Sequence, residues 1–101
     1  MLSYDINRNT LTVRLSGELD QREAEEVRRT LDALLEDGHI RRLVFDLSCL
    51  RFMDSSGIGL IIGRYKRLRR RNGSVAVTGL DERMNRIFDM AGLYQLVERL
   101  A

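Results

Sequence analysis

A short apolar run at 43–47 precedes a segment whose apolar residues recur with helical spacing. The run is typical of a strand buried on both faces, as in a parallel sheet that helices cover. The segment after it predicts a helix from about Ser55 to Arg71, because positions three and four apart lie on one helical face. The apolar residues of that face are Ile58, Ile61, Ile62, Tyr65 and Leu68. A buried strand that leads into a long helix points to the α/β class.

The flanking segments predict the other elements from period-two alternation, helix caps and turn residues. Before the buried strand, we expect a strand at 2–6, a turn at 7–9, a strand at 10–16, an exit loop at 16–20, and a helix capped by Asp20 that ends near Gly38. After the strand at 43–47 and the helix at 55–71, we expect a strand at 75–77, a helix capped by Asp81 that ends near Gly92, and a last strand within 93–100. The prediction is one domain over residues 1–101, with a mixed four- to five-stranded sheet and helices packed on it.

Composition excludes several classes of protein. The 101 residues are 44% hydrophobic, which is enough for one core, and 17 basic against 15 acidic residues give too balanced a charge to argue for nucleic acid. Cys49 and His39 are the only residues of their types, so neither an internal disulfide nor a His/Cys zinc site can form. We therefore predict no metal and no cofactor.

The sequence also indicates where the protein acts. A lone thiol fits a reducing cytoplasm, and the start of the chain lacks a signal-peptide pattern. No apolar run approaches the roughly 20 residues that cross a bilayer.

Two serines lie where the second helix is expected to begin. Asp54 or Ser55 is a suitable N-cap, so Ser55 and Ser56 are expected at the surface, at the positive end of the helix dipole. A phosphate on either serine would add about −1.5 to −2 charges there, against repulsion from Asp54. The alternative is that both serines serve only as cap residues.

One flank of this helix faces away from the sheet at about 100° per residue. It carries Ser56, Gly59, Leu60, Gly63 and Arg67, and each helical glycine costs about 1 kcal/mol relative to alanine. Small residues with one exposed leucine would let a partner approach closely. The alternative is that Leu60 lies beneath another part of the chain.

Charged residues form two further features. The cluster Arg64–Arg71 is basic enough to bind nucleic acid, but no aromatic platform accompanies it, and a solvated helix end explains it more simply. The mixed charges between Arg22 and Asp32 are expected to form a solvated helix face.

Catalytic constellations are missing from the sequence. A nucleophilic serine needs a nearby base, and His39 falls in a predicted loop with nothing to connect it to Ser55. The serines lack the G-x-S-x-G spacing, and no P-loop is present. Asp46 ends a strand, as a phospho-acceptor aspartate would, but no acidic pair follows an early strand to hold magnesium. We predict that the protein is not an enzyme.

Four motifs carry a resemblance to a known family. They are Ser16-Gly17-Glu18-Leu19-Asp20, Phe52-Met53-Asp54-Ser55-Ser56-Gly57, Gly63-Arg64-Tyr65-Lys66 and Phe88-Asp89-Met90-Ala91-Gly92-Leu93. In order and spacing the chain resembles the bacterial anti-sigma factor antagonists, the stand-alone STAS domains. The Gly63–Lys66 run is similar to the sporulation branch of that family.

The resemblance implies a phosphorylation switch. Ser55 would be phosphorylated by an anti-sigma factor that is also a serine kinase, and a PP2C-type phosphatase would reverse the reaction. The unphosphorylated form would bind the anti-sigma factor and release its sigma factor. The expected partner-binding residues are Glu18, Asp20, Asp54, Ser56, Gly57, Gly59, Leu60 and Gly63. Glu18 and Asp20 would meet a basic patch of the partner.

Two alternatives stay open beside this interpretation. The chain could belong to another partner-switching pathway, such as a stress response with a different kinase. Less favoured is a nucleic-acid-binding domain that uses the basic cluster.

Overall fold

A computed structural model describes residues 1–100 of the chain. Its elements are β1 (Leu2–Asn7), β2 (Thr10–Leu19), α1 (Gln21–Leu34), β3 (Arg42–Met53), α2 (Ser55–Arg69), β4 (Ser74–Thr78), α3 (Glu82–Met90), the 3₁₀ turn η1 (Leu93–Gln95) and β5 (Glu98–Arg99). The predicted order of strands and helices is confirmed. Several boundaries differ from the prediction: α1 ends at Leu34, α2 ends at Arg69, the last strand has only two residues, and the two central strands are longer.

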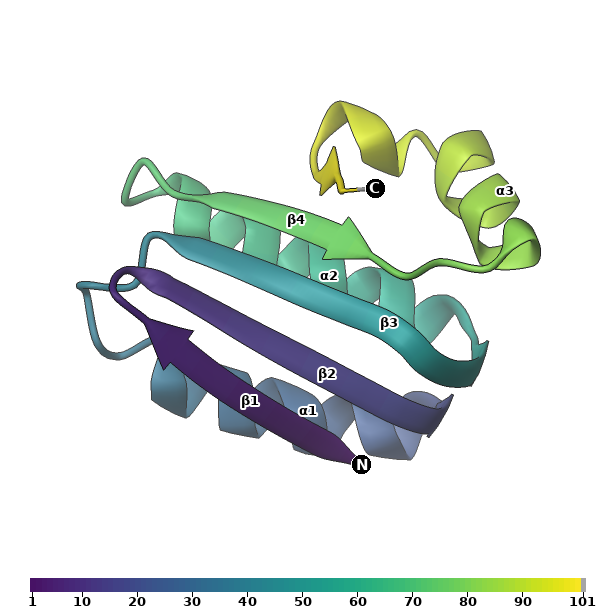
Figure 1. Ribbon diagram of the computed structural model, residues 1–101, viewed down its shortest axis with the longest axis horizontal. Helices are drawn as coiled ribbons and strands as arrows, with labels where there is room; N and C mark the ends of the chain where they lie inside the picture. The colour runs from purple at the N-terminus through teal and green to yellow at the C-terminus, as the bar shows by residue number, and fades with distance from the viewer. Residues whose placement is uncertain (101) are drawn as a thin grey trace.

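The strands form one mixed sheet in the order β1-β2-β3-β4-β5. β1 pairs with β2 antiparallel, and the other three pairs of neighbours are parallel. α1 and α2 lie on the same face of the sheet, behind it in Figure 1, whereas α3 lies beyond β4. The five-stranded mixed sheet with packed helices is the α/β architecture that the sequence predicts.

The two central strands are longer than predicted. β2 continues through the expected exit loop to Leu19, and β3 continues to Met53 rather than ending at Leu47. The register between them shifts twice, so β3 carries extra residues in bulges. Because bulges break the alternation of side chains, Leu50 and Met53 turn inward three residues apart while Ser48 and Phe52 stay exposed. A search for period two cannot detect such a strand.

The core lies between the sheet and the helices. Leu11, Val13 and Leu15 of β2 face the same side as Phe45 and Leu47 of β3, and all five side chains are buried. On the opposite face of β2 and β3, polar side chains are exposed or half-buried, among them Thr12, Arg14 and Asp46. The prediction that the strand at 43–47 is buried on both faces holds in part, because Val44 on the face away from α1 and α2 is buried, whereas Asp46 on that face is half-buried.

Candidate functional site

The start of α2 is fixed by a side-chain cap. Asp54 is the N-cap residue, and its carboxylate Oδ1 accepts a hydrogen bond from the backbone N–H of Ser56 at 2.8 Å. Asp20 caps α1 in the same way, accepting from Glu23 at 3.0 Å, and Asp81 caps α3. Each cap satisfies an N–H group that the first helical turn leaves free. The predicted caps Asp20 and Asp81 are confirmed, and of the two candidates at the start of α2 the cap is Asp54 and not Ser55.

The two candidate serines differ in exposure. Ser55 is the first residue of α2 and is exposed, as predicted. Ser56 is half-buried and lines a groove between α1 and α2. Ser55 is therefore the more accessible of the two, and it lies at the end of the helix where partial positive charge favours a phosphate.

The predicted acidic residues lie at the same edge of the sheet as Ser55. β2 and β3 are parallel neighbours, with Glu18 opposite Phe52 and Leu19 opposite Met53. The backbone N–H of Asp54 donates to the carbonyl of Leu19 at 3.3 Å, which joins the ends of the two strands. Glu18 and Asp20 are both exposed there.

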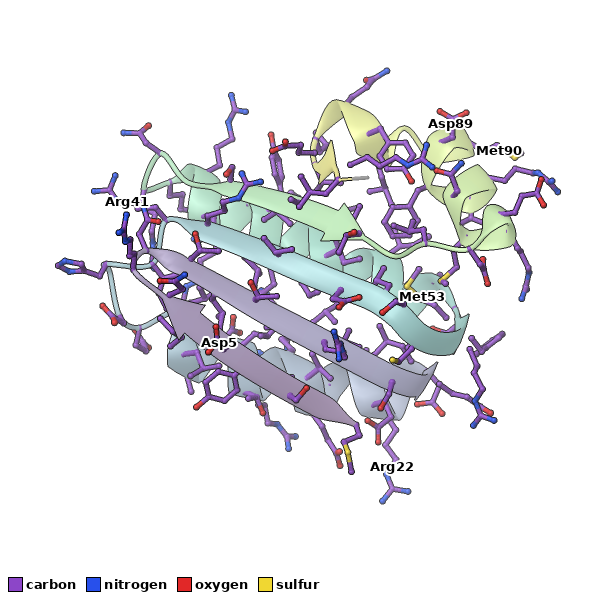
Figure 2. The ribbon with its side chains drawn as sticks, viewed as in Figure 1. Asp5, Arg22, Arg41, Met53, Asp89 and Met90 are labelled. Carbon is purple, nitrogen blue, oxygen red and sulfur yellow. The ribbon has the colours of Figure 1, made fainter. Side chains whose placement is uncertain are left out.

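An open hollow of about 720 Å³ lies beside this edge. It is lined by Asp20, Gln21, Arg22, Glu25, Glu26, Arg29 and Asp54. Four carboxylates outnumber two guanidinium groups in this lining. Arg22 extends from the start of α1 away from the body of the domain (Figure 2). Glu25 of this lining is already paired with Arg28 and Arg29, so part of the negative charge is balanced within α1.

The flank of α2 that was expected to face solvent faces α1 instead. Leu60 is only 5% exposed, so the prediction that it faces water is wrong and the alternative is correct. It lines an interhelical groove of about 190 Å³, together with Ser56, Gly59 and Arg64 of α2 and Gln21, Ala24, Glu25 and Arg28 of α1. Helical rotation predicts which side chains share a face, but it does not show that a second helix covers part of that face.

The three glycines of α2 have different surroundings. A Cβ at Gly57 would lie near Met53 and Leu19, since this glycine is buried against the end of β3. Gly57 is therefore a packing position, and its expected contact with a partner stays a prediction. At Gly59 and Gly63 a Cβ would meet no heavy atom within 4 Å. We call Gly59 and Gly63 the glycine flank of α2.

Charged residues fill the space between α1 and α2, where the sequence predicts only solvated faces. The Arg64 side chain is 11% exposed, and its Nε lies 3.3 Å from Oδ1 of Asp32. Arg67 also pairs with Asp32 at 3.3 Å, and it reaches Glu36 at 3.4 Å. Burial, opposed in part by attraction to Asp32, lowers the pKa of the Arg64 guanidinium below its ordinary value. The prediction of a solvated face fails for these residues.

Arg71 forms another contact that sequence reasoning missed. Its Nη2 donates to the carbonyl of Leu35 at 2.8 Å, and its Nη1 donates to the carbonyls of Asp37 and Ile40 at 3.2 Å. These carbonyls lie at and just beyond the end of α1, where helical partners run out. Of the cluster Arg64–Arg71, three arginines therefore bind α1 and the loop that follows it. Lys66, Arg69 and Arg70 remain exposed.

Among residues 1–100, no three His, Cys, Asp or Glu side chains gather closely enough to hold a metal ion. None of the helices in this part of the chain is both long and apolar enough to cross a membrane.

Comparison with known proteins identifies the family. The STAS domain family matches residues 1–101. The chain is 40% identical over 96 residues to the anti-sigma F factor antagonist of Paenibacillus polymyxa, covering 95% of this chain and 82% of the relative. It is 34% identical over 92 residues to the anti-sigma-B factor antagonist of Bacillus subtilis, covering 91% of this chain and 83% of the relative.

Solved structures agree with the sequence comparison. The anti-sigma factor antagonist SpoIIAA in its unphosphorylated form superposes with a TM-score of 0.83 at 25% identity, covering all of this chain and 88% of that one. The phosphorylated form of the Bacillus cell fate determinant SpoIIAA gives a TM-score of 0.81 at 27% identity, with coverage of 100% and 92%. Together with the sheet order and the capped helix start, these matches show that the chain belongs to the STAS domain family.

Proposed function

We propose that this chain is an anti-sigma factor antagonist that is switched by phosphorylation of Ser55. In its unphosphorylated form it binds an anti-sigma factor that is also a serine kinase, and this binding releases a sigma factor. Phosphorylation of Ser55 abolishes the binding, and a PP2C-type phosphatase restores it. The domain acts in the cytoplasm as a binding module and not as an enzyme.

The observation that carries the proposal is the position of the Ser55 hydroxyl. It is exposed at the first position of α2, beside a carboxylate that already caps the helix. A phosphate there would be accommodated by the helix dipole, so the domain is expected to stay folded. The names of the two SpoIIAA structures support the same switch, since they describe unphosphorylated and phosphorylated forms.

The surroundings of Ser55 support a protein-docking surface. The glycine flank of α2 leaves room for a partner's backbone, and the fold itself does not require glycine at either position. The acidic hollow shares Gln21 and Glu25 with the groove at Gly59, and together with Glu18 it favours a basic patch on the partner. A phosphate on Ser55 would add bulk and negative charge at the helix start beside these surfaces, where the partner is expected to lie.

The choice of pathway rests on similarity. The 40% identity to an anti-sigma F factor antagonist favours the sporulation branch of the family. The 34% identity to an anti-sigma-B factor antagonist keeps a second partner-switching pathway as the other candidate. Nucleic-acid binding receives less support, because three arginines of the basic cluster contact α1 and the loop after it.

The proposal is tested by incubating the purified chain with a candidate anti-sigma kinase and ATP. We expect a gain of about 80 Da, the mass of one phosphate group, at Ser55 in the wild-type chain and in Ser56→Ala. Ser55→Ala should gain no mass yet still bind the kinase. Ser55→Asp should stay folded by circular dichroism but lose binding. Modification of Ser55→Ala to the wild-type level would contradict the proposal, and so would tight binding by a folded Ser55→Asp.

A further inference from the structure

β1 forms an open edge of the sheet (Figure 1). The backbone groups that it presents can be assigned from its pairing with β2. Met1 and Ser16 exchange both of their N–H to C=O hydrogen bonds, each at 2.9 Å. In an antiparallel pair such doubly bonded positions alternate with unbonded ones. The register then directs the backbone groups of Ser3 and Asp5 toward β2, and those of Leu2, Tyr4 and Ile6 away from it.

The same edge exposes apolar side chains. Tyr4 is 51% exposed and Ile6 is 44% exposed, and Met1 next to them is also exposed. Among residues 1–100, half of the exposed large apolar side chains lie in these first six positions. Natural edge strands are usually protected by lysine, proline or a bulge. β1 has no lysine or proline, and its register with β2 is unbroken.

We propose that β1 pairs with β1 of a second copy of this chain, antiparallel and across a two-fold axis. Tyr4 lies opposite Tyr4 of the partner subunit, and Leu2 lies opposite Ile6 of the partner subunit. The free N–H and C=O groups of all three residues then find partners, and Tyr4 and Ile6 lose solvent exposure. The two sheets become one continuous sheet.

Charge repulsion favours this register over the one in which each strand is shifted by one residue. With the two Tyr4 residues opposite each other, Asp5 faces Ser3 of the partner subunit, and a hydroxyl can donate to a carboxylate. A shift of one residue along each strand would place Asp5 opposite Asp5 of the partner subunit. Like charges directly opposite each other destabilise a strand pair, most of all in the closely spaced unbonded position.

The dimer should be weak, and it leaves the switch site free. A six-residue edge buries less than the roughly 800 Å² per partner of a standard interface, so we expect a dissociation constant on the order of 10⁻⁵ to 10⁻⁴ M. α2 lies behind β3 and β4, away from β1 (Figure 1). The dimer therefore presents two copies of Ser55. This inference does not depend on the proposed function.

Sedimentation equilibrium of the full chain between roughly 10 μM and 1 mM tests the pairing in that affinity range. We expect a reversible monomer–dimer equilibrium. The dissociation constant of the dimer should rise at least about tenfold in Tyr4→Lys, because this variant places two ammonium groups opposite each other. Met90→Lys is the control, because Met90 is also a large exposed apolar residue but lies on α3 (Figure 2). A monomer at every concentration would overturn the proposal. Equal weakening by both variants would also overturn it.

Cysteine pairs test the register independently of any charge effect. In a Cys49→Ser background, Tyr4→Cys should form an intermolecular disulfide on oxidation, because directly paired residues have Cα atoms about 5.5 Å apart. Asp5→Cys is offset from its symmetry mate in this register and should remain largely reduced. If Asp5→Cys cross-links as fully as Tyr4→Cys, the register is wrong and the proposal fails.

Discussion

Replacing the glycines of α2 by alanine separates folding from docking within one helix. At Gly57 an added Cβ would lie 3.0 Å from Cδ2 of Leu19 and would overlap the side chain of Met53. Met53 is buried, so it has little room to move. At Gly59 and Gly63 the added methyl group would point into open space.

The expected stability changes have opposite signs. Gly59→Ala and Gly63→Ala should each raise the free energy of unfolding by about 0.8–1 kcal/mol, because alanine restricts the unfolded chain and favours the helix. For a domain of this size, a change of about 1 kcal/mol corresponds to a rise of roughly 4–8 °C in Tm. Gly57→Ala should lower the free energy of unfolding by about 1–3 kcal/mol through overpacking.

Two measurements on the same preparations complete the test. Urea and thermal unfolding give the stabilities, and titration with the cognate anti-sigma factor gives the affinities. If the glycine flank is a docking surface, Gly59→Ala should bind about tenfold more weakly, which is about 1.4 kcal/mol, although it is more stable.

Each outcome has a distinct meaning. A less stable Gly59→Ala would show that the space beside Gly59 is not open. A more stable Gly59→Ala with wild-type affinity would place the partner elsewhere and refute the role of the glycine flank. A Gly57→Ala protein as stable as the wild type would refute the packing role assigned to Gly57.

Three further predictions concern stability and are measured by urea unfolding. Asp54→Ala should lower the free energy of unfolding by about 1 kcal/mol through loss of the α2 cap, and an unchanged value would show that the cap is dispensable. Asp32→Ala should cost about 2–3 kcal/mol, because it leaves Arg64 buried without its carboxylate, whereas the double variant with Arg64→Met should recover most of that loss. Burial alone would raise the pKa of Asp46, but hydrogen bonds from Ser48 and Arg14 outweigh it and hold that pKa below its ordinary value. The ionised Asp46 therefore stabilises the fold at pH values above its unfolded-state pKa of about 3.9, and this stabilisation is lost as the pH falls through the lower folded-state pKa. Between roughly pH 4 and 2, the free energy of unfolding should therefore fall less in Asp46→Asn than in the wild type.

Features encoded by neighbouring residues could be predicted from the sequence. The sequence predicts the caps Asp20 and Asp81, and narrows the α2 cap to Asp54 or Ser55, because a short polar side chain needs only its own helix to act as a cap. The sheet and its crossovers followed from the order of periodic segments. The exposure of Ser55 followed from its position beside a cap.

Features that depend on distant residues could not be predicted. The burial of Leu60 and Arg64 depends on how α1 lies against α2, and neither helix encodes that contact in its own periodicity. The extension of β3 beyond Leu47 depends on bulges against β2, which replace alternation with a spacing of three. The packing role of Gly57 requires the position of Met53, which only the folded sheet provides.

The central claim is that a phosphate on Ser55 blocks docking without unfolding the domain. The most direct measurement is the affinity of one preparation for its anti-sigma factor before and after phosphorylation, with the thermal unfolding curve recorded for both forms. We predict at least a hundredfold weaker binding, about 2.7 kcal/mol, with a Tm changed by no more than a few degrees. Equal affinity in both forms would contradict the account, and so would a phosphorylated domain that has lost its cooperative unfolding transition.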